Sequence, residues 1–341
     1  MKRFDALVIG GGPAGAAAAI RAAQLGLSVC LVDASKPGEF KIGESLPPAA
    51  TRILNDLGAT AAFAPGIAAP SFGNQSAWGG PELRDTDFIR DPAGHGWHVD
   101  RARFDSTLRA IASKNGAQVY EQVRVSPSRT GKTWRAAVGD ETLEARWLID
   151  CGGRTSARSV RRKTFDRLIA IVGQFASVDA DTRTLIESAP CGWWYTSLLP
   201  NGRRVAVFHT DARNEASRVA RTPEGFQTLV ALTRYVSRRL DGGASQLAVV
   251  SAATTRLESF HGPEWLAAGD AAMTFDPLSS QGIYTALYGG MKAAEALQSG
   301  SADVLAESLG RVFDAYLQNR RIYYGDEQRW PESPFWRSRQ E

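Results

Sequence analysis

Three glycines near the start of the chain have the spacing of a dinucleotide-binding loop. Gly10, Gly12 and Gly15 follow an apolar run, residues 6–9, and precede an Ala-rich stretch typical of a helix, residues 13–25. In such a loop the first glycine allows a tight turn, and the second lets the backbone approach a pyrophosphate. The third lets the helix pack closely on the strand. The sequence therefore predicts a strand, a phosphate-binding loop and a helix in that order.

An acidic residue lies where the ribose of a bound dinucleotide would need one. The helix would begin at Pro13 and Ala14, and its free N–H groups would face the phosphates. A second apolar run, residues 27–32, then ends at Asp33, followed by Ala34. An acid about 20 residues after the glycines binds a ribose hydroxyl in such units. A glycine-rich turn without a ligand would not explain Asp33, so we expect a dinucleotide cofactor here.

Two later segments repeat the combination of glycine and acidic residues. The first contains Asp150, Gly152, Gly153, Arg154, Ser156 and Arg158. The second contains Gly269, Asp270, Pro277, Gln281, Gly282 and Ile283.

With the three motifs in this order, the chain resembles the FAD-dependent monooxygenases of the p-hydroxybenzoate-hydroxylase type and their flavin-halogenase relatives. The resemblance covers nearly the whole sequence and implies FAD as the cofactor, with a ribityl hydroxyl bound by Asp270. It also implies that Pro277 to Ile283 lies against the isoalloxazine, where helix N–H groups stabilise negative charge on a reduced flavin. The remaining cofactor contacts are expected at Gly43, Glu44, Ser45, Arg101, Val123, Gly152, Gly269, Gln281 and Gly282.

Further segments resemble one subgroup, the LodB/GoxB-type and QhpG-type flavoproteins. The segments are residues 43–48 (GESLPP), Arg101 within VDRARFD, residues 192–195 (GWWY) before Leu199-Pro200, and the aromatic tail, residues 323–336. Those proteins are associated with making tryptophan-derived quinone cofactors by oxygenating a Trp side chain of a partner protein. The resemblance implies a quinoprotein precursor polypeptide as substrate and partner.

Halogenase motifs are broken in three places. The W-x-W-x-I-P motif is replaced by Trp193-Trp194-Tyr195-Thr196-Ser197, and Ser279 stands where tryptophan halogenases have a Glu. Residues 71–78, which resemble the strand of the halogenase catalytic Lys, contain no Lys. These departures argue against chlorination guided by a lysine.

Four residues are candidates to act on the substrate: Trp193, Tyr195, His209 and Glu44. Trp193, Trp194, Tyr195 and Phe208 lie on two predicted neighbouring strands, so alternate side chains would face the flavin, or they would fill an intersheet core. His209 is either a general base for a phenol or indole or a hydrogen-bonded residue at a strand end. Glu44 either acts at the site or caps its loop.

The electron source and the wider class of function stay open. A second loop with the Gly-x-Gly-x-x-Gly spacing is lacking, so we expect NAD(P)H to bind transiently or a partner flavin reductase to supply reduced FAD. Four scattered histidines and three cysteines show no metal-ligand spacing, so no metal is expected. The alternatives are a hydroxylase or halogenase of a free or carrier-bound small aromatic, a reductase of isoprenoid double bonds, and a flavin-containing assembly factor for a quinoprotein.

The elements that position these residues alternate between helical and strand patterns. Helices are expected over residues 13–25, 53–57, 101–115, 222–236, 281–298 and 304–324. Strands are expected over residues 71–78, 118–125, 134–138, 143–149, 168–176, 193–199, 205–210, 247–251 and 265–268, with hairpin turns at Gly139-Asp140 and Asn201-Gly202.

The fold class predicted from this order is α/β. A Rossmann-like FAD-binding domain (residues 1–60, 97–164 and 254–300) would interleave with a β-sheet substrate domain (61–96 and 165–253), followed by a C-terminal helix and tail (301–341). The 341 residues, 43% apolar and 22% charged, are ordinary for a globular protein, with a formal net charge of +4. We expect a soluble cytoplasmic protein without nucleic-acid or membrane partners.

Overall fold

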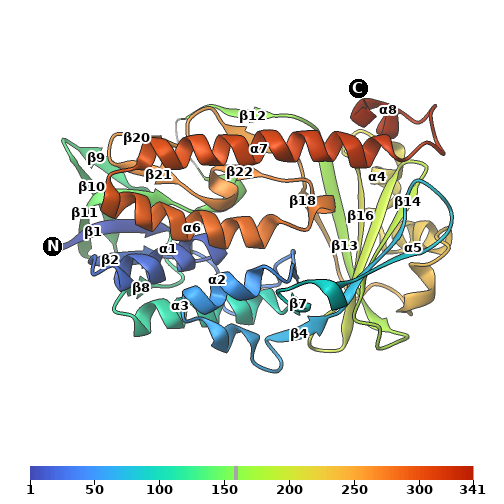
Figure 1. Cartoon of the computed structure of the whole chain (residues 1–341), viewed down its shortest axis with the longest axis horizontal. Coiled ribbons are helices and arrows are strands. Elements are labelled where there is room, and N and C mark those ends of the chain that lie inside the picture. Colours follow the sequence, from blue (N-terminus) through green and yellow to red (C-terminus); the bar gives the residue numbers. More distant parts are fainter. Residues whose placement is uncertain (157–159, 341) are drawn as a thin grey trace.

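A mainly parallel sheet forms the core of one half of the fold, the half that carries the N-terminus (Figure 1). The computed structural model describes residues 1–156 and 160–340, so Arg158 of the second glycine motif lies outside the described residues. The strand order is β20-β21-β11-β1-β2-β8, and β1 pairs in parallel with both β2 and β11. The strands are β1 (Lys2–Ile9), β2 (Val29–Val32), β8 (Gln118–Tyr120), β9 (Ser128–Thr130), β10 (Thr133–Val138), β11 (Glu141–Asp150), β20 (His261–Gly262) and β21 (Trp265–Ala267).

A close helix pair covers this sheet. Nine residues of α1 are buried, and its small side chains let it approach α6. A Cβ at Gly290 of α6 would lie 1.9 Å from the carbonyl oxygen of Ala14, so only glycine fits at this crossing. The helices are α1 (Pro13–Gln24), α2 (Ala50–Asp56), α3 (Arg101–Lys114), α4 (Glu215–Val219), α5 (Pro223–Ala231), α6 (Gly282–Ser299), α7 (Ala302–Gly325) and α8 (Pro334–Gln340).

A large, mainly antiparallel sheet forms the other half. Its order is β17-β13-β16-β15-β14-β5-β6, and β18 also pairs with β13. Side chains alternate across it: Trp194 and Phe208 face a core with Phe226 of α5, whereas Trp193 and Val207 face Tyr324 of α7. Its strands are β5 (Gly73–Ala77), β6 (Arg84–Asp87), β13 (Leu168–Ser177), β14 (Thr184–Ala189), β15 (Gly192–Leu198), β16 (Arg203–Asp211), β17 (Leu240–Asp241) and β18 (Leu247–Ser251).

Two small sheets and the C-terminal helices join the halves. Figure 1 shows α7 running along the molecule from the parallel sheet to the large sheet, where α8 follows. The small sheets are β3 (Ser45–Leu46), β7 (Gly96–Val99) and β4 (Ala68–Ser71), and β12 (Arg162–Thr164), β19 (Thr255–Leu257) and β22 (Met273–Thr274). Of the described residues, no helix is long and apolar enough to cross a membrane.

The α/β fold class predicted from the sequence is confirmed, as are most of its elements. Asp100 caps α3 by accepting a hydrogen bond from the Arg103 N–H, and Thr222 caps α5 through the Gly225 N–H. The strand expected over residues 118–125 is wrong beyond Tyr120, because Gln122 has a left-handed backbone (φ +60°) that ends the extended conformation.

Other predicted boundaries also need correction. The strand expected over residues 71–78 is divided between β4 and β5, the helix expected to residue 236 ends at Ala231, and both β14 and α8 were missed. The division into an FAD-binding and a substrate domain stays a proposal; within residues 61–96, β4 pairs with β7, and β5 and β6 join the large sheet.

Candidate functional site

One cavity of about 890 Å³ lies between the two sheets, and all three glycine motifs contribute to it. We call its first side the glycine-loop wall, which comprises Gly10, Gly12, Pro13, Ala14, Asp33, Ala34, Asp150, Gly152, Arg154, Asp270, Gly282 and Ile283. We call its second side the sheet wall, which comprises Ala170, Tyr195, Val207, His209, Ala248, Val250, Ser251 and Ala252. Between the walls lie Gly43, Glu44, Ser45, Arg101, Val123 and Pro277.

The first glycine motif combines one open position with two crowded ones. A Cβ at Gly10 (φ +92°) would lie 2.3 Å from the Cys151 carbonyl oxygen, and a Cβ at Gly15 would lie 1.7 Å from that of Gly10. A Cβ at Gly12 would meet no atom of residues 1–156 and 160–340 within 4 Å and would enter the cavity. Gly12 is also the N-cap of α1 and no side chain caps it, so this helix end is open to an anion such as pyrophosphate.

Asp33 follows β2 and is fixed beside the glycine loop. Its Oδ1 accepts a hydrogen bond of 3.0 Å from the Gly11 N–H, and Ser35 donates to its other oxygen. Burial alone would raise the pKa of Asp33, but these hydrogen bonds and the Arg109 charge outweigh it and lower the pKa. Asp33 is therefore an ionised acceptor on the cavity wall, as a ribose hydroxyl requires.

The second and third motifs meet through an ion pair. The Gly152 N–H donates to Asp150 Oδ1 over 3.0 Å, which closes the turn after β11. Arg154 Nε then lies 3.2 Å from Asp270 Oδ2, and both side chains are about one-third exposed. The carboxyl ends of β11 and β21 thus bring two distant segments to the same end of the parallel sheet.

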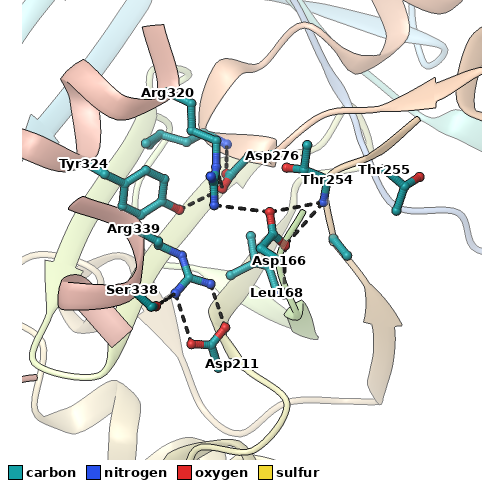
Figure 2. A network of polar contacts seen from close by, with 12 residues as sticks. Asp166, Leu168, Asp211, Thr254, Thr255, Asp276, Arg320, Tyr324, Ser338 and Arg339 are labelled. Carbon is teal, nitrogen blue, oxygen red and sulfur yellow. Dashed lines mark hydrogen bonds and ion pairs between the residues drawn. The ribbon is translucent and has the colours of Figure 1, made fainter. Parts of the chain in front are cut away.

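The loop before α6 is fastened to the C-terminal helix. Asp276 is 1% exposed; its Oδ1 accepts from the Leu278 N–H, and its Oδ2 accepts from Tyr324 Oη over 2.8 Å. Burial raises the pKa of Asp276 even though the Arg320 guanidinium lies 3.4 Å away. Figure 2 shows Arg320 pointing to Asp276 and Asp166. This network fixes the loop that leads into Pro277.

A neighbouring ion pair anchors α8 to the large sheet. Arg339 donates to both oxygens of Asp211 over 2.7 and 3.0 Å (Figure 2). Its side chain is 2% exposed, and the pKa of Arg339 is raised despite its burial, because Asp211 accepts these hydrogen bonds. The tail is therefore packed against the strand that carries His209.

The residue 43–45 loop joins the two walls. Arg101 donates from Nη1 to the carbonyl oxygens of Ile42 and Gly43, each over 2.9 Å. Ser45 Oγ lies 2.7 Å from Tyr195 Oη, and Ser197 donates to the buried Glu44 carboxylate over 2.6 Å. The loop is thus attached to α3 on one side and to β15 on the other.

Tyr195 is the one member of the aromatic group that lines the cavity. Burial and the nearby Glu44 charge raise its pKa well above the usual value, so its hydroxyl stays protonated and can donate a hydrogen bond. Trp194 and Phe208 lie on the opposite face of the sheet, stacked with ring centroids 4.7 Å apart. Strand alternation therefore divides the group between the cavity and a core.

Trp193 does not line the cavity; its indole is 0% exposed and lies behind His209. The two rings stack with centroids 3.7 Å apart, and Trp193 donates to Tyr324 Oη over 3.0 Å. Burial lowers the pKa of His209 to about 3, so its ring stays neutral and is a poor general base. His209 Nδ1 is buried without a hydrogen-bond partner among the described residues.

Three other predicted cofactor residues lie off the cavity surface. Gly15 and Gly269 allow close packing: a Cβ at Gly269 (φ +62°) would lie 2.7 Å from Ala14 Cβ. Gln281 is an exposed N-cap of α6 whose side chain makes no capping bond. We therefore propose a packing role for the two glycines and direct cofactor contact for the residues on the walls.

The sequence analysis missed several residues at the site. Lys41 lines the cavity and lies 3.0 Å from Asp105, and residues 124–127 complete one rim. Asp276 and Tyr324 were also missed, although an Asp before a Pro is a usual turn initiator. Within residues 1–156 and 160–340 there is no group of His, Cys, Asp or Glu side chains that could bind a metal ion.

Comparisons with known proteins agree with this geometry. The family model described as an FAD binding domain matches residues 3–323. A protein of Marinomonas mediterranea named as the FAD-dependent oxidoreductase LodB is 27% identical, over 99% of this chain and 97% of its own length. A carrier-protein pyrrole brominase of Pseudoalteromonas luteoviolacea is 25% identical, over 87% of this chain and 78% of its own length.

Two solved structures share the fold. The myxobacterial chondrochloren halogenase CndH superposes with a TM-score of 0.86 at 23% identity, covering 99% of this chain and 86% of its own. The peptidyl tryptophan dihydroxylase QhpG superposes with a TM-score of 0.78 at 24% identity, covering 99% and 79%.

The family match spans most of the chain, and the three glycine motifs surround one cavity. The open N-terminus of α1 and the ionised Asp33 suit the pyrophosphate and ribose of FAD. The chain therefore belongs to the FAD binding domain family and is an FAD-dependent oxidoreductase of the flavin monooxygenase and halogenase superfamily.

Proposed function

We propose that this chain oxygenates the side chain of a tryptophan residue in a partner polypeptide, as a step in making a tryptophylquinone cofactor. The observation that carries the proposal is the contrast between the two walls of the cavity. The glycine-loop wall has open backbone and carboxylates that suit FAD, whereas the sheet wall contains no charged side chain. An uncharged, largely apolar wall suits an indole ring.

The comparisons support the substrate class. The match to LodB covers nearly the full length of both chains, and QhpG, which shares the fold, is described as a peptidyl tryptophan dihydroxylase essential for tryptophylquinone cofactor biogenesis. The aromatic tail that resembles this subgroup runs from the end of α7 to the first turn of α8 and packs on the sheet wall's strands through Phe335 and Trp336.

We assign the cofactor contacts to the wall residues. The α1 N-terminus would bind the pyrophosphate, Asp33 a ribose, Asp270 the ribityl chain, and the segment from Pro277 to Ile283 the ring. When bound and reduced, FAD supplies activated oxygen to an aromatic ring. The protein's task is then to exclude water and to orient the substrate.

The sheet wall contributes two neutral hydrogen-bonding groups. Tyr195 stays protonated, so we propose that Ser45 donates to its oxygen across their 2.7 Å contact and that the Tyr195 O–H donates to the oxygen being transferred. His209 stays neutral at working pH, so we assign it contact with the substrate ring and withdraw the general-base role. Trp193 is a positioning residue, because it reaches the cavity only through His209.

For the electron source, we keep two proposals: transient NAD(P)H binding and a partner flavin reductase. A second candidate function is hydroxylation or halogenation of a small free or carrier-bound aromatic, which relatives such as the pyrrole brominase favour. Ser279 stands at the Glu position of tryptophan halogenases, and its Oγ donates to the Asp276 carbonyl oxygen over 2.9 Å. Ser279 therefore caps its own turn. Because the Glu of tryptophan halogenases is absent at this position, the site favours oxygenation over halogenation.

The test supplies reduced FAD and oxygen to the purified protein with a quinoprotein precursor encoded by a neighbouring gene. We expect mass spectrometry to show oxygen added to a Trp of the precursor, and Asp270→Ala, which removes a proposed flavin contact, to abolish the addition. Full effect on the precursor's maturation after flavin loss would instead identify an assembly factor. Bromotryptophan formed from free tryptophan and bromide would identify a halogenase.

A further inference from the structure

One edge of the large sheet is unprotected, and it lies at the cavity. Among the described residues, β18 (Leu247–Ser251) pairs only with β13. Its sequence, LAVVS, contains neither a charge nor a proline, and Val249 and Val250 are 43% and 37% exposed. Proteins normally protect such an edge with charges, prolines or bulges, because a bare edge pairs with other chains.

The opposite edge of the same sheet has this protection. β6 (Arg84–Asp87) has the sequence RDTD, and all four residues are exposed. Charges therefore block strand pairing at the edge remote from the cavity and are absent from β18, the edge strand beside the cavity. The difference indicates that β18 is open to a partner strand.

The hydrogen-bond pattern shows which backbone groups β18 offers. The Ala252 N–H donates to the Leu168 carbonyl oxygen over 2.9 Å, so these two residues form a hydrogen-bonded pair of the antiparallel ladder. Such pairs alternate along a ladder, and therefore Ala248 and Val250 also bond to β13. Leu247, Val249 and Ser251 then direct their N–H and C=O groups away from the sheet.

The same strand forms the end of the sheet wall. Ala248, Val250 and Ser251 line the cavity beside Ala170 of β13 and His209 of β16. A strand added to β18 would lie about 4.8 Å further along the sheet, with alternate side chains facing the cavity side. An extended peptide could therefore place one side chain in the cavity and its two neighbours outside.

We propose that β18 is the docking edge for the polypeptide substrate: an extended segment of the partner pairs with the free backbone groups of Leu247, Val249 and Ser251, and its Trp enters the cavity. The inference rests on the proposed function and specifies how that substrate binds. Backbone hydrogen bonds give such docking its affinity, and the cavity that receives the alternate side chain gives its specificity.

Proline at Val249 tests the edge without breaking the sheet. The Val249 N–H is not part of the β13 ladder, so Val249→Pro removes an outward donor and blocks strand addition. Val249→Ala keeps the N–H and is the conservative variant. Asp87→Pro places proline on the opposite edge, where the neighbouring Phe88 N–H bonds to the Phe72 carbonyl oxygen and the Asp87 N–H therefore also points outward. Absorbance of bound FAD and the thermal unfolding midpoint verify that each variant is folded.

The probe is a short capped peptide in which a central Trp is flanked by alternating Thr and Val, with a fluorescent label at one end. We expect its Kd for the FAD-loaded protein, measured by fluorescence anisotropy, to rise on the order of 10-fold in Val249→Pro. Val249→Ala and Asp87→Pro should bind like the parent. The docking proposal would be overturned if the unsubstituted protein does not bind the peptide, or if Val249→Pro and Val249→Ala bind it with equal Kd values.

Binding and turnover are read separately, so the two proposals fail in different ways. Peptide binding that Val249→Pro weakens, without oxygenation of the Trp, supports the docking edge and counts against the proposed function. Oxygenation that proceeds with the same KM in Val249→Pro overturns the docking edge and leaves the proposed function standing. If β18 instead pairs two copies of this chain, sedimentation will show dimers of the parent that Val249→Pro dissociates, which also overturns the inference.

Discussion

The two walls of the cavity are built in different ways. The glycine-loop wall consists of turns at the carboxyl ends of parallel strands, where backbone atoms and short side chains of Gly10, Gly12 and Asp33 face the cavity. The sheet wall consists of one face of an antiparallel sheet, where alternate side chains such as Tyr195 and His209 face it. The first wall suits a cofactor with phosphates and hydroxyls, and the second suits an aromatic ring.

The difference lies also in what fixes each wall. The first glycine loop of the glycine-loop wall is fixed locally, since Gly11 donates to Asp33 across 22 residues of sequence. The sheet wall depends on the C-terminal helices, since Trp193 is bonded to Tyr324, 131 residues away. We therefore expect variants of the first wall to lose FAD, and variants of the second to keep FAD and lose turnover.

The largest effect is expected for Gly12→Val. Its Cβ would meet none of the atoms in the described part of the chain within 4 Å, and the side chain would occupy the space proposed for the pyrophosphate, so the protein should fold and lose its yellow colour. We expect FAD affinity to fall on the order of 1,000-fold, or about 4.1 kcal/mol, by fluorescence titration. Gly243→Val, at an exposed glycine with equally open surroundings, is the control. FAD bound at the parent's affinity by Gly12→Val would remove the pyrophosphate from this wall.

A smaller effect is expected for Tyr195→Phe on the sheet wall. Loss of the proposed hydrogen-bond donor should lower kcat on the order of 100-fold, because it acts where charge develops during oxygen transfer. FAD content should be unchanged, which separates this variant from Gly12→Val. The matched variant is Trp194→Phe, on the opposite face of the same strand, which should keep kcat. Flavin loss in Tyr195→Phe would show that the walls do not divide cofactor from substrate.

The sequence could predict the glycine-loop wall because each of its three segments carries a local motif. Gly10, Gly12 and Gly15 lie within six residues, and their spacing alone specifies a tight turn and two close approaches. Asp33 follows from the length of one strand–helix–strand unit. Close packing at Gly15 was expected from the spacing, whereas for Gly269 spacing cannot distinguish packing from ligand binding, so its role stays a proposal.

The sheet wall was only partly predictable. Alternation along β15 shows that Trp193 and Tyr195 share a face and that Trp194 lies on the other. It cannot show that α7 and α8 cover Trp193, because that contact depends on a helix that follows more than a hundred residues later. The alternation also could not predict that burial lowers the pKa of His209 to about 3, because the residues next to His209 in the sequence do not cause that burial.

The smallest effect concerns pH and again contrasts the walls. The pKa of His209 falls from 6.5 to about 3 on folding, so the unfolded chain binds more protons between these values and stability is lost as pH decreases through this range. From pH 7.5 to 5.0 this one histidine should remove about 2 kcal/mol from the free energy of unfolding. Asp33, on the glycine-loop wall, has a pKa lowered from 3.8, so its contribution is lost only at still lower pH. His98, which lies against β14 and has a pKa of about 4, adds a second decrease in stability over the same pH range as His209.

Denaturant unfolding of His209→Phe, which keeps an aromatic ring against Trp193, tests this prediction. The free energy of unfolding of the variant should depend on pH less strongly, by about 2 kcal/mol. If His209→Phe and the unsubstituted protein show the same pH dependence, His209 is solvated and becomes charged in the folded protein. The sheet wall would then carry a charge.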